Sequence, residues 1–137
     1  TEGEWQYAAS YKDGSSWLPH YYASGGTAAY TDAAVTGLVA WYDGNSGNTT
    51  KKVGTKAANA LGIHDMSGNV WEWCWDWSGT LPVTEQNNYR GQTSGSARVR
   101  RGGSYNLSAD HLMVGYRNSI APFLRDNIIG FRLVSRQ

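Results

Sequence analysis

The chain is poor in several residue types, and each shortage excludes a class of protein. It has one cysteine, Cys74, so it forms no internal disulfide and has no thiol pair for redox chemistry. Only 17% of its residues are charged and its formal net charge is +1, so no bulk attraction to nucleic acid or to an anionic membrane is expected. It contains no run of about 18 apolar residues, which excludes a membrane-spanning helix.

What the chain does contain is typical of a compact domain rich in loops. Among its 137 residues are 17 glycines, nine tyrosines and seven tryptophans, a composition unlike that of a disordered chain or a helical bundle. The length fits one domain with a single sizeable core. We therefore expect residues 1–137 to form one domain.

The segment WEWCWDW, residues 71–77, is the strongest local signal. Every odd position is tryptophan, and the even positions are Glu72, Cys74 and Asp76. Alternation with a period of two predicts a strand with one buried and one polar face. We expect the four indoles to line an aromatic core, Cys74 to be a small buried residue, and the preceding Ser-Gly-Asn to form a turn.

The remaining chain predicts short elements separated by long loops. Residues 1–10 predict a helix, because Thr1 can cap it and Glu4 stands at the capping-box position. We expect irregular loop over 11–40, a brief strand over 39–42 and a turn over 43–48. Further strands are expected over 98–105 and 129–134, with 114–118 able to pair. The expected class is α+β, with short antiparallel strands.

Three stretches together resemble a known family: residues 62–73 (GIHDMSGNVWEW), residues 98–105 (RVRRGGSY) and residues 130–132 (GFR). In this order they resemble the formylglycine-generating-enzyme (sulfatase-modifying factor) domain, which has a variant of the C-type lectin fold. TEGEW at the start resembles a helix of that family. The resemblance implies a C-type-lectin-like domain that lacks the amino-terminal part of the full family domain.

The oxidase chemistry of that family is not expected here. The resemblance places a copper-binding cysteine pair just after the GGSY segment, and Leu107 and Leu112 occupy those positions. Copper(I) requires soft thiolate ligands, which leucine does not offer. Related iron-dependent enzymes use two histidines and a glutamate, and His20, His64 and His111 do not show that spacing. We predict that the chain is not an enzyme.

The chain more closely resembles the variable proteins of diversity-generating retroelements, in which a carboxy-terminal stretch is rewritten at the adenines of a template. Their constant frame is similar to RGGS at 101–104, Arg117, Pro122, Arg125 and IGFR at 129–132. The resemblance implies that residues between these frame positions are diversified and bind a ligand. The candidates are Tyr105, Leu107, Asp110, His111, Gly115, Tyr116, Ser119, Ile120, Ala121, Phe123, Leu124, Asp126 and Ile128.

The composition of 105–128 also favours a binding surface. Large apolar and aromatic side chains alternate with Asp, His and Ser in a region rich in turns, as in an antibody paratope. The arginines would then be framework, donating to carbonyls that loops leave unpaired; these are Arg101, Arg117, Arg125 and Arg132. The alternative is that the apolar residues form part of the core.

A calcium site is a separate expectation, implied by the same family. Asn69, the carbonyl of Val70 and Glu72 offer oxygen ligands of the kind that Ca²⁺ prefers. The alternative is that Asn69 holds the turn and Glu72 pairs with an arginine. Asp43, Asn45 and Asn48 also carry oxygen atoms, although the glycine and serine between them suit a plain turn.

The function predicted from these observations is non-catalytic binding of an unknown protein or cell-surface ligand, and not of nucleic acid. No cofactor is required, and calcium is considered only as a structural ion. The alternatives are an oxidase or degenerate oxidase acting on peptides, and a lectin-like module that stacks Trp and Tyr on sugars. The resemblance implies a location on a cell surface or a phage, although the sequence shows no anchor.

Overall fold

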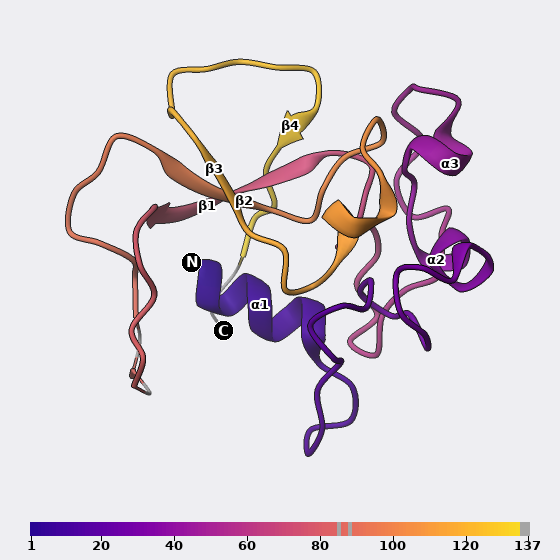
Figure 1. Ribbon diagram of the computed structural model, residues 1–137, viewed down its shortest axis with the longest axis horizontal. Coiled ribbons are helices and arrows are strands. Elements are labelled where there is room, and N and C mark those ends of the chain that lie inside the picture. The colour runs from indigo at the N-terminus through magenta and orange to yellow at the C-terminus, as the bar shows by residue number, and fades with distance from the viewer. Residues whose placement is uncertain (85, 88, 135–137) are drawn as a thin grey trace.

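The computed structural model describes residues 1–84, 86–87 and 89–134, in which short helices and a small sheet are linked by long loops (Figure 1). The sheet has the strand order β3-β2-β1-β4. β2 is antiparallel to β1 and to β3, whereas β4 is parallel to β1, so the sheet is mixed where only antiparallel strands were expected. The elements are α1 (Glu2–Ser10), α2 (Ala33–Val39), α3 (Asp43–Ser46), β1 (Trp71–Trp77), β2 (Arg98–Arg101), the 3-10 helix η1 (Ala109–Leu112), β3 (Asn118–Ile120) and β4 (Ile129–Gly130).

The predicted amino-terminal helix and its cap are confirmed. The Thr1 hydroxyl accepts a hydrogen bond from the Glu4 amide at 3.2 Å, and the Glu4 carboxylate accepts from the Thr1 amine and hydroxyl at 2.7 and 2.8 Å. Such a cap contributes about 1 kcal/mol to helix stability. Trp5 and Ala9 lie on the buried face of α1, and Glu2 is buried as well.

Strand β1 has the predicted bounds and Cys74 is buried as expected, but the prediction that the tryptophan face is the buried one is wrong. Glu72, Cys74 and Asp76 are buried, whereas the Trp75 side chain is 72% exposed. The acids can be buried because each has a donor on α1. Asp76 accepts from the Glu2 amide at 2.6 Å, at the amino end of the helix, and Glu72 accepts from the Trp5 indole at 2.8 Å.

The hydrophobic core consists of two clusters. The first lies between α1 and the sheet and contains Trp5, Ala9, Met66, Cys74, Val99 and Val114. The second packs α2 and the following segment against η1 and contains Ala23, Val39, Ala40, Tyr42 and Leu112. The indole of Trp71 is buried too, but the core is formed largely by small and aliphatic side chains rather than by stacked tryptophans.

Several loop predictions need correction. Helix α2 lies within the stretch expected to be irregular, and Asp32 caps it by accepting from the amides of Ala34 and Val35 at 3.1 and 3.0 Å. The expected strand over 39–42 is absent, since Val39 ends α2. The expected turn over 43–48 is the single helical turn α3, closed by Gly47 at a φ of 63°. The strand expected over 129–134 ends at Gly130.

Burial of the one cysteine gives a prediction that tests this packing. Removal from water, together with the nearby Glu2 carboxylate, raises the pKa of the Cys74 thiol to about 12. Because the thiolate is the reactive form, we expect iodoacetamide to alkylate Cys74 at pH 8 at least about 100-fold more slowly in the folded protein than in urea. Mass spectrometry over time measures both rates. Equal rates would show that the face of β1 that bears Cys74 is open to solvent.

Candidate ligand-binding surface

The segment that carries the candidate binding residues follows two buried glycines whose backbone conformation is fixed. Gly102 and Gly103 have φ values of 92° and 75°, and a Cβ on Gly103 would lie 2.8 Å from the carbonyl oxygen of His111. The Tyr105 amide then donates to the Asn69 carbonyl at 2.8 Å, and the Ser46 hydroxyl donates to the Tyr105 carbonyl at 2.7 Å. The Tyr105 side chain is only 8% exposed, so its prediction as an accessible binding residue is wrong.

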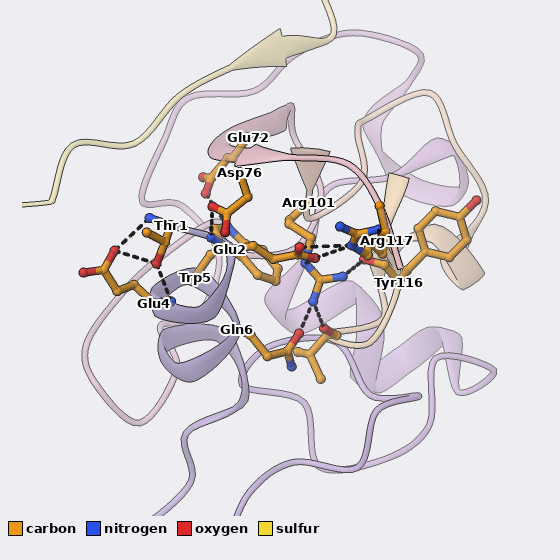
Figure 2. A network of polar contacts seen from close by, with 12 residues as sticks. Thr1, Glu2, Glu4, Trp5, Gln6, Glu72, Asp76, Arg101, Tyr116 and Arg117 are labelled. Carbon is orange, nitrogen blue, oxygen red and sulfur yellow. Dashed lines mark hydrogen bonds and ion pairs between the residues drawn. The ribbon is translucent and has the colours of Figure 1, made fainter. Parts of the chain in front are cut away.

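The buried Arg101 side chain hydrogen-bonds the backbone in the middle of residues 105–128 (Figure 2). Its guanidinium donates to the Val114 carbonyl at 2.8 Å, and also to the Tyr116 carbonyl and the side-chain oxygen of Gln6. Glu2 lies 3.6 Å from its Nε atom. Burial lowers the pKa of Arg101, and the negative charge of Glu2 opposes this effect. One buried arginine thus ties both ends of the turn at 114–116 to α1.

Arg117 and Arg132 complete this framework. Arg117 donates to both carboxylate oxygens of Glu2 at 2.8 and 3.0 Å and to the Gly79 carbonyl at 3.0 Å. Arg132 donates to Glu72 at 2.7 Å and to the His64 carbonyl at 2.9 Å. Arg125 is exposed and has no hydrogen bond or ion pair within the described part of the chain. The framework role expected of four arginines therefore applies to three of them.

The residues of the expected calcium site have protein partners. The Asn69 side chain accepts from the Lys51 amide at 3.0 Å and donates to the Lys51 carbonyl at 3.1 Å, with the residue held at a φ of 60°. Glu72 is shared between Trp5 and Arg132, and Val70 is half-buried beside them. These contacts match the alternative in which Asn69 holds the turn and Glu72 pairs with an arginine. The calcium site stays a prediction.

The residues at the family's copper positions do not fit a copper ion. Leu112 is fully buried in the second core cluster, and Leu107 is half-buried. Neither side chain carries a donor atom, and the lone thiol, Cys74, lies in the other core cluster against α1. Copper(I) would find no thiolate pair here.

The other candidate residues reach the surface to different degrees. Phe123 and Leu124 are the largest exposed apolar side chains among them, at 80% and 45% exposure. Gly115, Ser119 and Asp126 are also exposed. Half-buried positions are Leu107, Asp110, His111, Tyr116, Ile120, Ala121 and Ile128. We call these twelve residues the display surface.

Three members of the display surface form a polar and aromatic cluster over η1. The Ser108 hydroxyl donates to Asp110 at 2.5 Å and lowers the pKa of that carboxyl group. His111 lies 3.2 Å from the same carboxylate, and its ring centroid lies 4.7 Å from that of Tyr116. Mixed polar and aromatic groups on a fixed backbone can bind a partner by shape and hydrogen bonding. The Ser108 hydroxyl also lies 3.3 Å from Nδ1 of His111.

Comparison with known proteins identifies the family. The sulfatase-modifying factor enzyme 1-like domain matches residues 1–137. The chain belongs to this family. Among curated relatives, it is 35% identical over 133 residues to the chaperone protein LppX of Paenibacillus barcinonensis, covering 85% of this chain and 41% of LppX. It is 41% identical over 68 residues to a formylglycine-generating enzyme of Thermomonospora curvata, covering 46% of this chain and 22% of the enzyme.

Among solved structures, this sulfatase-modifying-factor-like domain strongly resembles variable protein 1 of Treponema denticola, a variable protein of a diversity-generating retroelement. The two superpose with a TM-score of 0.82 at 41% identity, over 96% of this chain and 44% of variable protein 1. The expected fold and both expected resemblances are therefore confirmed. The chain spans less than half the length of each of these relatives.

Sequence reasoning missed two features beside the display surface. Glu2, which binds Arg117 and faces Arg101, had no signal beyond its place at the start of a helix. The arginines of β2 that stack on the tryptophans of β1 were read only as part of a strand. The alternation Arg98-Val99-Arg100, opposite a strand of alternating tryptophans, could have indicated this stacking.

Proposed function

We propose that this domain is a non-catalytic ligand-binding protein whose display surface carries diversified residues. Its partner would be a protein or another ligand on a cell surface. The observation that carries the proposal is that residues 101–132 contain two sets of side chains, one that holds the fold and one that reaches solvent. Arg101, Arg117 and Arg132 bind backbone carbonyls and buried acids, whereas the display surface between them reaches solvent.

We therefore expect substitution of the displayed side chains to change the stability of the fold only slightly. The backbone of 102–117 is positioned by bonds from Arg101, Ser46 and the carbonyl of Asn69, none of which involves a displayed side chain. Exposed substitutions away from such bonds typically change stability by about 0.5 kcal/mol or less. A few exposed aromatic anchors, of which Phe123 is the most accessible, would supply most of the binding energy.

The similarity to enzymes of the family does not by itself support oxidase activity of this domain. The positions that would require a cysteine pair are Leu107 and Leu112, and one of these is a core residue. The similarity to variable protein 1 is stronger over this chain and supports binding.

DNA sequence around the gene tests the diversification directly. We expect a near-copy of the DNA encoding residues 98–137 beside a reverse transcriptase gene, with differences at adenines of the near-copy. The differences should fall in codons of the display surface and spare those of Arg101, Arg117 and Gly130. A complete genome without such a copy, or one with differences concentrated in the framework codons, would contradict the proposal.

A further inference from the structure

The face of the sheet opposite α1 has an unusual composition. Figure 1 shows α1 along one side of the sheet, with α2 and α3 beyond one end, and no helix of the described residues lies over the opposite face. The register places Arg98 opposite Trp77 on β1 and opposite Ile120 on β3. Arg100 lies opposite Asn118 on β3. Because side chains alternate along a strand, arginines and tryptophans gather on this face.

The arginines of this face are held in stacked positions. The Arg98 guanidinium lies 3.6 Å from the centroid of the Trp77 ring and 4.9 Å from that of Trp75, and it donates to the Trp75 carbonyl. The Arg100 guanidinium lies 4.7 Å from the Trp71 ring, and its Nε donates to Asn118 at 3.1 Å. We call Trp75, Trp77, Arg98 and Arg100 the Trp–Arg face.

The positive charges of this face are not balanced by an acid in contact with them. Within the described residues, neither Arg98 nor Arg100 has a carboxylate within 4.0 Å. Asp126, a member of the display surface, attracts Arg100 through space. Most N–H donors of both guanidinium groups have no protein acceptor in the described part, while stacking already fixes their planes. Guanidinium groups whose planes are already fixed lose little further conformational entropy when they bind a carboxylate.

We propose that the Trp–Arg face binds an acidic peptide segment of the partner protein, with Arg98 and Arg100 holding carboxylates and Trp75 packing against an apolar side chain. This inference rests on the proposed function and names the chemistry of its partner. The Trp75 indole, 72% exposed, offers a large apolar contact beside the two cations. Charge complementarity therefore carries the assignment.

The stacking limits the aromatic surface that is open to nucleic acid or a neutral sugar. Bases and sugar rings bind to open aromatic faces. Arg98 lies over the Trp77 ring and Trp71 is buried, so of the tryptophans stacked by these arginines Trp75 alone is largely exposed. The net charge of +1 also provides little attraction for a polyanion of high charge density.

The position of this face connects it to the display surface. Ile120 lies opposite Arg98, and Asp126 acts on Arg100, so two residues predicted to be diversified adjoin the two arginines of the Trp–Arg face. The Trp–Arg face would bind acidic segments, and its neighbours would adjust selectivity. Removing the competing carboxylate with Asp126→Asn should strengthen binding of an acidic probe severalfold.

Binding of a glutamate-rich copolymer of glutamate and tyrosine tests the inference, with a lysine–tyrosine copolymer and oligo-dT as comparison probes. We expect saturable binding of the acidic copolymer and weakening by about tenfold in Arg98→Gln. Arg98→Lys should recover only part of the loss, because lysine keeps the charge but not the planar fork. Lys12→Gln removes one positive charge at an exposed position beyond α1 and should change affinity by less than about twofold.

Each other outcome contradicts the inference. Absence of binding to the acidic copolymer, or equal weakening by Lys12→Gln and Arg98→Gln in proteins with unchanged urea midpoints, would exclude a specific acidic site. Tighter binding of oligo-dT would reassign the face to nucleic acid. These results leave the proposed display function standing if the near-copy of the gene is found, so the two ideas fail separately.

Discussion

Arg101→Met should lower the free energy of unfolding by about 3 to 5 kcal/mol, the typical cost of removing one member of a buried ionic network. Arg101 is 3% exposed and donates to the carbonyls of Val114 and Tyr116. Methionine fills similar space but donates no hydrogen bond, so both carbonyls would lose their partner inside the protein. Arg117 still neutralises Glu2 in this variant, which isolates the effect on the backbone of the display surface.

Urea unfolding followed by tryptophan fluorescence measures this change. Arg125→Met is the matched control, because Arg125 is exposed and has no partner within the described residues, and we expect a change of about 0.5 kcal/mol or less. Similar midpoints for the two variants would show that Arg101 does not hold the framework.

Gly68→Ala should be comparably damaging, at about 3 to 5 kcal/mol. Gly68 has a φ of 80°, and a Cβ there would lie 2.2 Å from the Trp41 carbonyl oxygen and 2.9 Å from the Trp41 carbonyl carbon. The Gly68 amide also donates to the Gly102 carbonyl at 2.7 Å, immediately before the display surface. Backbone movement that relieves the clash would therefore shift the turn before β1 away from Gly102, which follows β2.

Gly62→Ala separates the clash from the cost of a positive φ. Gly62 has a φ of 73°, but a Cβ there would meet nothing within 4 Å. We expect it to cost about 1 to 2 kcal/mol, the conformational penalty alone. If thermal or urea unfolding gave the same loss for both alanine variants, close approach of the backbone at Gly68 would not be the cause.

Local sequence signals predict the bounds of helices and strands better than they predict which face of an element is buried. The cap of α1 and the extent of β1 follow from contacts within a few residues, and both were correct. Which face of β1 is buried depends on α1, far away in the sequence, whose amide and indole donors allow Asp76 and Glu72 to be buried. Alternation alone favours the indoles as the buried set, because nothing in the segment itself reveals those donors.

The candidate site was predictable to the extent that it follows the family frame. Of the four frame arginines, Arg101, Arg117 and Arg132 hold the backbone or buried acids. Tyr105 is buried, and ligand binding by the other twelve candidates stays a prediction. The burial of Tyr105 could not be read locally, because it results from packing beside Ser46, 59 residues earlier in the chain, and from the bond to Asn69. The Trp–Arg face was missed because it requires the register between β1 and β2.

The most direct test of a fixed frame with a tolerant surface compares two libraries sorted for protease resistance. One library randomises the displayed residues Leu107, Asp110, His111, Phe123, Leu124 and Asp126 together, and the other randomises Arg101, Ser104, Leu112, Val114 and Arg117. We predict that most members of the first library remain folded and that most members of the second do not. Equal loss of folded protein in the two libraries would contradict the division between frame and displayed surface.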